Sequence, residues 1–223
     1  MSTPVAEAFF DFACPYSFLA YNRVREATMR TQSELEWRPV AAAALEAALE
    51  EPTAALTQAQ RNYRLKDLKS WASYCGLFVE RDYDSEVDST AALKGTFLAI
   101  EHGVANQYVK AVFEACWCDN KDIADIKLLT DIATEAGLEA KEFAEWLDKT
   151  VVADALERNA KEFVEAGGFV LPGFIVADEL ILGNERMPLV ELALGQASDI
   201  EFVLPGQHDI WSGMDEQAEV ENG

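Results

Sequence analysis

The stretch VAEAFFDFACPYS, from Val5 to Ser17, decides how this chain folds. Residues 5–12 are mostly apolar and Pro15 follows them closely, so they predict a short buried strand. Pro15 suits the first position of a helix, because its missing N–H would have no intrahelical partner there. No helix breaker follows until about Thr31, so the same stretch predicts a strand that passes directly into a helix.

The rest of the chain predicts more β structure at its two ends and helices between them. Residues 34–40 alternate polar and apolar side chains, as a half-buried strand does, so residues 5–40 predict a parallel βαβ unit. From about residue 41 to 166, glycine and proline are sparse and helix formers dominate. We expect helices over residues 57–75, 89–102, 106–117, 122–136, 141–149 and 152–166.

The β pattern returns at residues 169–177 and 180–183, with a turn at Asp178 and Glu179, and a helix over 187–196 closes the fold. The two β-rich ends can share one sheet, which is an α/β thioredoxin-like fold with a large all-helical insertion. We predict a thioredoxin-like domain formed by residues 1–45 and 167–200, a helical insertion over 46–166, and a C-terminal tail over 201–223.

The composition excludes several classes of function. Lysine and arginine number 18 and aspartate and glutamate 40, for a formal net charge of −22. Such a field repels nucleic acid and acidic membranes. We find no run of 18 apolar residues and no basic signal segment. Four cysteines without a disulfide or metal-ligand spacing favour the reducing cytoplasm and no metal site.

Cys14 lies between the first strand and the first helix, where a thiol can carry chemistry. The macrodipole and the free N–H groups of a helix N-terminus favour a thiolate, so we expect a lowered pKa for Cys14. Ser17 stands where a dithiol motif has its second cysteine, so redox chemistry at Cys14 needs an outside thiol. The alternatives are a small buried residue at position 14 and an ordinary helical hydroxyl at position 17.

Two sites near the C-terminal end add to this candidate site. Pro172 interrupts a strand pattern, which a cis Leu171–Pro172 bond would explain, since it exposes the Leu171 backbone to an extended peptide-like ligand. The alternative is a trans proline at a strand start. Asn184 and Glu185 open the last helix, where an N-cap and a first-turn acid would also explain them.

A basic segment lies in the first inserted helix, at residues 61–69. At 100° per residue, Arg61 and Arg64 share the apolar stripe that continues to Leu68, so we expect both to face inward and to bind an anionic ligand. Lys66 lies on a different face. The alternative for this segment is ordinary salt bridging to neighbouring acids.

Five short motifs follow one another along the chain in the order found in a known group of proteins. They are FDFACPYSFLA (10–20), YRLKDL (63–68), FEACW (113–117), FVLPGF (169–174) and GNER (183–186). Together they resemble 2-hydroxychromene-2-carboxylate isomerases and kappa-class glutathione transferases, in the DsbA-like branch of the thioredoxin superfamily. The resemblance covers about residues 5–196.

The resemblance implies a glutathione site. Cys14 would face the glutathione sulfur with Ser17 beside it, and Leu171 next to Pro172 would pair with the cysteinyl unit. Asn184 and Glu185 would take the γ-glutamyl end, although the resembling motif usually has aspartate at position 185. The candidates for holding a carboxylate of glutathione or of the substrate are Arg61, Arg64 and Lys66.

Three functions remain open. The resemblance implies a cytoplasmic, homodimeric, glutathione-dependent isomerase or transferase, in which a thiolate adds to a small aromatic or conjugated carboxylate. The resembling families usually have serine where this chain has Cys14, which favours the alternative of a monothiol thiol-disulfide oxidoreductase that uses glutathione. The third alternative is a non-catalytic module that binds a peptide beside Pro172.

Overall fold

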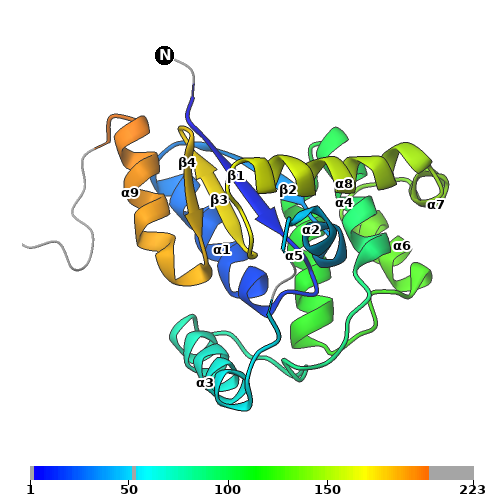
Figure 1. Ribbon diagram of the computed structural model, residues 1–223. Coiled ribbons are helices and arrows are strands. Elements are labelled where there is room, and N and C mark those ends of the chain that lie inside the picture. Colours follow the sequence, from blue (N-terminus) through cyan, green and yellow to red (C-terminus); the bar gives the residue numbers. More distant parts are fainter. Residues whose placement is uncertain (1–2, 52–53, 201–223) are drawn as a thin grey trace, which may run out of the picture.

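The structure, a computed structural model, describes residues 3–51 and 54–200, and it is built on one four-stranded sheet. The strands are β1 (Val5–Phe10), β2 (Glu34–Pro39), β3 (Gly173–Val176) and β4 (Glu179–Leu182), in the spatial order β2-β1-β3-β4. β1 runs parallel to β2 and antiparallel to β3, which pairs antiparallel with β4 (Figure 1). The two ends of the chain therefore share one sheet, as predicted.

Helices cover both faces of this sheet. α1 (Pro15–Arg30) and α9 (Met187–Ala197) pack together on one face, where Ala8 and Phe10 of β1 join the larger core cluster. The opposite face carries Phe9, whose ring stacks on Phe163 of α8 (Thr150–Glu165) with 4.6 Å between ring centroids. Alternate residues of β1 thus supply two separate cores, as the two-residue period of a strand requires.

The predicted strand at 169–177 is too long. β3 begins only at Gly173, because the preceding residues are irregular and contain a cis Leu171–Pro172 bond. The turn of the β3–β4 hairpin also lies one residue earlier than predicted, at Ala177 and Asp178. Both have positive φ angles, +48° and +67°, as the central residues of a type I′ hairpin turn do.

The middle of the chain is helical, as predicted, with two differences. A short helix that the pattern did not predict, α2 (Ala42–Ala48), follows β2. The helix expected over 106–117 is divided into an α-helix and a π-helix, η1 (Glu114–Cys118). The other helices in this part are α3 (Gln58–Tyr74), α4 (Thr90–Glu101), α5 (Ala105–Phe113), α6 (Ile126–Glu135) and α7 (Ala140–Leu147).

The fold is therefore thioredoxin-like with a large helical insertion. Trp117 of η1 ties the two parts together, because its buried indole Nε1 donates a 2.9 Å hydrogen bond to the carbonyl of Phe12, just before Cys14. The domain limits at residues 45, 46, 166 and 167 stay predictions, and the predicted tail over 201–223 lies outside the described residues. Within residues 3–51 and 54–200, no helix is long and apolar enough to cross a membrane.

Candidate active site

Cys14 and Pro172 come together although they lie far apart in the sequence. Cys14 is the N-cap of α1, in extended conformation, and its backbone N–H donates to the Asp11 carbonyl at 3.0 Å. Its Sγ donates to the carbonyl oxygen of Leu171 at 3.4 Å, across 157 positions of sequence. The cis form of the Leu171–Pro172 bond, one of the two alternatives drawn from the sequence, is confirmed.

The expected thiolate at Cys14 is wrong. Burial raises the pKa of the Cys14 thiol, and the negative charge of Asp11 raises it further. Hydrogen bonds from the side chain and backbone of Ser17 lower it, but they do not outweigh the burial. The Ser17 side chain is itself buried and accepts a long, 3.5 Å hydrogen bond from the Asp11 amide. Cys14 is therefore a neutral thiol near pH 7.

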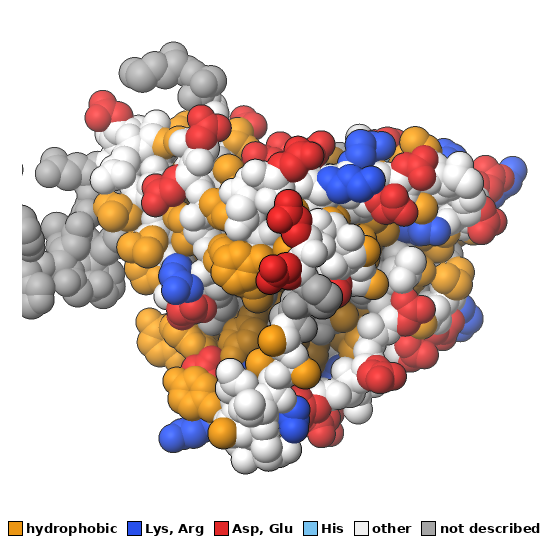
Figure 2. Space-filling model, in the orientation of Figure 1, with side chains coloured by type: hydrophobic (Ala, Val, Ile, Leu, Met, Phe, Trp, Pro, Cys, Tyr) orange, Lys and Arg blue, Asp and Glu red, His pale blue; other side chains and the backbone are white. Residues whose placement is uncertain are grey.

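A cleft opens beside Cys14 and Pro172. It lies between α3 on one side and the β3–β4 hairpin and the segment after it on the other. Its volume is about 870 Å³, within the range of small-molecule sites. Figure 2 shows hydrophobic side chains gathered around the hollow. Cys14 is half-buried and does not line the cleft, whereas its neighbours Tyr16 and Leu171 do. The other lining residues are Tyr63, Asp67, Trp71, Phe169, Val170, Glu179, Leu180, Ile181, Leu182, Gly183, Glu185, Arg186 and Leu189.

Leu171 presents backbone groups at the edge of this cleft. Its carbonyl accepts the Cys14 thiol, and its side chain is almost fully buried. In the part of the chain that the structure describes, the Leu171 amide N–H has no hydrogen-bond acceptor. A backbone donor and a backbone acceptor in one residue match the needs of an extended, peptide-like ligand.

Tyr16 and Asp67 form a contact in the cleft that the sequence reasoning missed. The Tyr16 hydroxyl donates to Asp67 Oδ2 at 3.0 Å, so α1 is tied to α3. Burial and this carboxylate raise the pKa of Tyr16, so its phenol stays neutral. A signal did exist in the spacing of Tyr63, Asp67 and Trp71, which recur every four residues and therefore share one face of α3.

Of the two arginines of α3 that were expected to face inward, Arg64 does and Arg61 does not. Arg61 is exposed and folds back on its own helix start, where it donates to the Leu56 carbonyl and to the side chain of Gln58, so the expectation that it points inward is wrong. The packed face of α3 is narrow, because only Leu68 and Ala72 of this helix are buried. Arg61 therefore lies beyond the part of the helix that packs.

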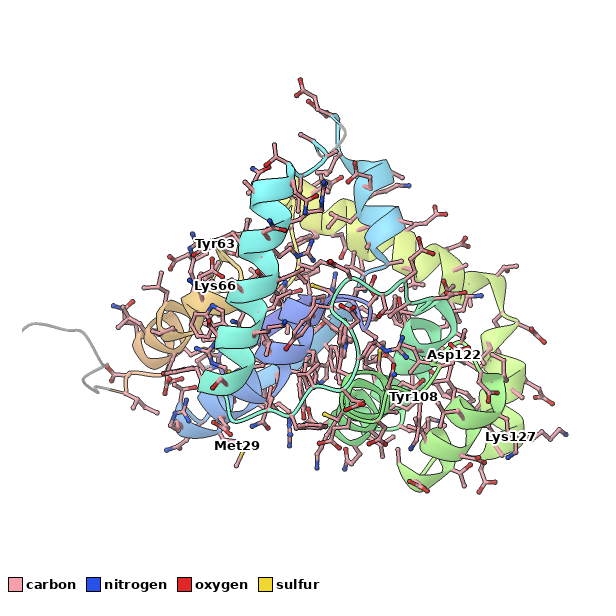
Figure 3. The ribbon with its side chains drawn as sticks, turned by 90° about the horizontal axis from the view of Figure 1, so that it is seen from below. Met29, Tyr63, Lys66, Tyr108, Asp122 and Lys127 are labelled. Carbon is pink, nitrogen blue, oxygen red and sulfur yellow. The ribbon has the colours of Figure 1, made fainter. Side chains whose placement is uncertain are left out.

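Arg64 and Lys66 have different positions. Arg64 is half-buried, with its guanidinium 5.7 Å from the centre of the Tyr16 ring. Lys66 is exposed and lines a separate shallow depression with Lys69, on the other face predicted for it; Figure 3 shows α3 with Lys66 and Tyr63 labelled. Over residues 3–51 and 54–200, Arg61, Arg64 and Lys66 form no ion pair, so the salt-bridge alternative is wrong too.

Asn184 and Glu185 are held very differently from each other. Asn184 is fully buried, and Arg23 Nη1 donates to both its backbone oxygen and its Oδ1, at 2.8 Å each. It is not an N-cap, because the short 3₁₀ turn η2 (Asn184–Arg186) follows Gly183 and the α-helix begins only at Met187. The Glu185 carboxylate lies at the cleft and pairs with Arg186. Of the two predicted ligand residues, only Glu185 has its side chain at the cleft.

The remaining cysteines lie away from this centre. Cys116 is fully buried in η1, where burial raises the pKa of its thiol to about 12. Cys75 and Cys118 are half-buried, and all four cysteines are free thiols. Among the residues the structure describes, no group of three or more histidine, cysteine, aspartate or glutamate side chains is arranged to hold a metal ion.

A βαβ start, a returning β-hairpin and a cysteine that faces a cis-proline at a helix N-terminus define a thioredoxin-like protein. The family model of the DsbA-like thioredoxin domain matches residues 5–195, and this chain belongs to that family.

The relatives of this chain include isomerases, disulfide oxidoreductases and an uncharacterised protein. A 2-hydroxychromene-2-carboxylate isomerase of Pseudomonas putida is 23% identical over 196 residues, covering 86% of this chain and 95% of its own length. An uncharacterised protein of Bacillus subtilis is 25% identical, covering 84% and 94%. The solved structure of a 2-hydroxychromene-2-carboxylate isomerase superposes with a TM-score of 0.74 at 21% identity, covering 86% and 95%. A probable DsbA oxidoreductase of Streptomyces coelicolor gives 0.73 at 21%, covering 92% and 94%. A cytosolic disulfide reductase of Pseudomonas aeruginosa, solved with GSH, gives 0.64 at 14%, covering 87% and 98%.

Proposed function

We propose that this protein is a glutathione-dependent isomerase or transferase that acts on a small aromatic or conjugated carboxylate. The observation that carries the proposal is the place of the Cys14 thiol, which donates to the Leu171 carbonyl at the start of α1, beside the cis Leu171–Pro172 bond and next to the cleft. Burial raises its pKa, which favours the neutral thiol. A neutral thiol is a hydrogen-bond donor and a poor nucleophile, so this site suits a sulfur that comes from outside the chain.

The backbone at Leu171 fits a bound glutathione. Its amide N–H has no acceptor within the described residues, and its carbonyl holds only the Cys14 thiol. The cysteinyl unit of glutathione has the complementary donor and acceptor. In the same cleft, the Glu185 carboxylate suits the γ-glutamyl ammonium group. Asn184 would hold this turn in place from within, through Arg23, and would not touch the ligand.

When bound, glutathione would supply the thiolate for addition to the conjugated double bond and for its elimination after rotation. Cys14, whose proton points to the Leu171 carbonyl in this structure, would turn that proton toward the thiolate as a hydrogen bond and keep it, so no net oxidation or reduction occurs. A thiol is a weaker donor than the serine of the resembling families, so this stabilisation is modest. Tyr63, Trp71 and Phe169 offer the substrate an aromatic wall.

A monothiol oxidoreductase is the second candidate, favoured by one observation. Cys14 is a cysteine and lies against the Leu171 carbonyl, in the position from which a sulfur could exchange with a disulfide held along the same backbone. Its raised pKa opposes this function, because exchange needs the thiolate. In both cases we propose a cytoplasmic, homodimeric protein.

Replacement of Cys14 by serine separates the candidates. We expect Cys14→Ser to keep or increase glutathione-dependent isomerisation or conjugation of aromatic, conjugated carboxylates, because the hydroxyl is the stronger donor. The matched control is Cys75→Ser, which changes a half-buried thiol at the end of α3. Both variants and the wild type are also assayed for reduction of a glutathione mixed disulfide.

Each outcome selects one function. Loss of disulfide reduction in Cys14→Ser, with no isomerisation by any of the proteins, would overturn the proposal in favour of the oxidoreductase. If the wild type has neither activity but glutathione or an unstructured peptide raises its melting temperature, the protein is the binding module instead.

A further inference from the structure

The Asp11 carboxylate lies buried in the turn that precedes Cys14, and sequence reasoning assigned it no role. Asp11 has an exposed fraction of only 2%. Its Oδ1 accepts the amide N–H of Ala13 at 2.9 Å and the hydroxyl of Ser89 at 2.5 Å, and its Oδ2 accepts the amide N–H of Ala42 at 2.8 Å. One carboxylate therefore joins the turn before Cys14 to two segments of the chain beyond β2.

These contacts bring three helix starts together. Cys14 precedes the first residue of α1, Ala42 is the first residue of α2, and Ser89 precedes the first residue of α4. Helix N-termini carry a positive partial charge, which favours an anion at this place. All three contacts to the carboxylate come from donors, so the geometry matches an ionised group that accepts on both oxygens.

The charge on Asp11 is compensated by dipoles alone. Among the described residues, no lysine, arginine or histidine forms an ion pair with it. On balance the pKa of Asp11 is raised: burial raises it most, its three hydrogen bonds lower it, and the carboxylate of Asp88 raises it. The other titratable groups that feel Asp11 are the thiols of Cys14 and Cys116, and its charge raises the pKa of both.

We propose that Asp11 is a positioning residue for the chemistry at Cys14: it clamps the turn that presents the thiol and, when ionised, opposes a second negative charge on the neighbouring sulfur. The proposal rests on the proposed function. Asp11 is buried and does not line the cleft, whereas a ligand sulfur would approach from the cleft. Asp11 thus keeps Cys14 as a donor and leaves the anionic sulfur to the ligand.

Asp11→Asn tests this assignment without glutathione. The amide keeps the size of the side chain and removes its charge. We expect the pKa of Cys14 to fall, so that its alkylation profile moves to lower pH, because a nearby like charge disfavours the thiolate. The measurement is the pH dependence of iodoacetamide alkylation at Cys14, followed by mass spectrometry that resolves Cys14 from Cys75, Cys116 and Cys118.

Ser89→Ala is the matched control, because it removes one bond of the clamp and keeps the negative charge. We expect it to lower the melting temperature and to leave the alkylation profile of Cys14 in place. A Cys14 pKa that is unchanged in Asp11→Asn, or that falls equally in both variants, would overturn the electrostatic role. Circular dichroism shows whether Asp11→Asn is folded; if it is not, the alkylation is repeated with sucrose as a stabilising osmolyte, which does not react with iodoacetamide.

A second readout links the result to function. Oxidised glutathione converts a Cys14 thiolate into a Cys14–glutathione mixed disulfide and releases one glutathione thiolate, so sulfur and electrons balance. We expect Asp11→Asn to form this adduct several-fold faster than the wild type at pH 7. A faster adduct without any isomerase activity in the wild type would support the role of Asp11 and contradict the proposed function, so the two failures are distinguishable.

Discussion

Gly173 is the position where a single methyl group should disturb the site most clearly. It is the first residue of β3 and follows the cis Leu171–Pro172 bond directly. A Cβ at this position would overlap two ring atoms of Phe163 and lie 3.2 Å from Leu182 Cδ2. Phe163 is fully buried and stacked on Phe9, so its ring cannot move without disturbing the smaller core.

The expected cost of Gly173→Ala follows from this overlap. Overpacking of a filled core costs about 1–3 kcal/mol. Because the overlap involves two atoms of a stacked, buried ring, the cost lies in the upper part of that range, about 2–3 kcal/mol. Alanine in place of glycine also stabilises the protein by about 0.5–1 kcal/mol, because it lowers the conformational entropy of the unfolded chain. We therefore expect a net loss of about 1–2.5 kcal/mol in the free energy of unfolding. For a chain of this size that lowers the melting temperature by about 2–10 °C.

Urea denaturation of a double-mutant cycle checks the cause. Phe163→Leu removes the ring atoms that the new methyl group would strike, so Gly173→Ala should cost less than about 0.5 kcal/mol in that background. Equal costs in both backgrounds, or a wild-type melting temperature for Gly173→Ala alone, would refute the reasoning. The position matters for function because Leu171, two residues earlier, accepts the Cys14 thiol.

Two further predictions concern groups that flank the site. Arg23→Met leaves Oδ1 of the fully buried Asn184 without its donor, whereas the Asn184 backbone oxygen keeps the amide N–H of Met187. This change should cost about 1.5–3 kcal/mol in urea denaturation, the range for hydrogen bonds to a charged group. Arg25→Met removes only a long, 3.4 Å bond to Asn22 and should cost less than about 0.5 kcal/mol, and equal losses would contradict this. Burial raises the pKa of Cys116 from 9.0 to about 12, so the folded state binds this proton more tightly and stability falls as pH rises above about 9. Between pH 8 and pH 10 the wild type should therefore lose about 1.4 kcal/mol of unfolding free energy that Cys116→Ala does not lose, so the difference in stability between the two proteins becomes smaller. Parallel curves of unfolding free energy against pH would show that Cys116 does not titrate as stated.

The sheet could be predicted because its residues carry local signals. Residues 5–12 and 34–40 alternate or cluster apolar side chains, and Pro15 marks the helix between them. β1 and β3 lie far apart in the sequence, but their pairing could be expected because both strands must bury apolar side chains in one shared core. The cleft wall on α3 was misjudged because two stripes share that helix, and only tertiary packing decides that Tyr63, Asp67 and Trp71 face the cleft.

The protonation of Cys14 could not be predicted from its place at a helix start. A helix N-terminus acts on any residue at that position, and the sequence shows it plainly. Desolvation depends on what packs over the thiol, and here that is Leu171, from the other end of the chain. The carboxylate of Asp11 is visible in the sequence three residues before Cys14, but its burial depends on Ala42 and Ser89. The effect of the helix start was therefore predictable, whereas the burial of the thiol and of the charge behind it depends on tertiary contacts.

The same balance bears on the choice between the two functions proposed for this chain. Both proposals place a sulfur at the start of α1 beside the cis-proline, and they differ in which sulfur carries the negative charge. In this chain burial and Asp11 act together against a charge on Cys14, and only the hydrogen bonds from Ser17 and Tyr16 favour one. Neutralising Asp11 should move the protein toward exchange without changing a single residue that a ligand touches. The choice between the two chemistries would then lie in the buried charge behind the cysteine rather than in the cysteine itself.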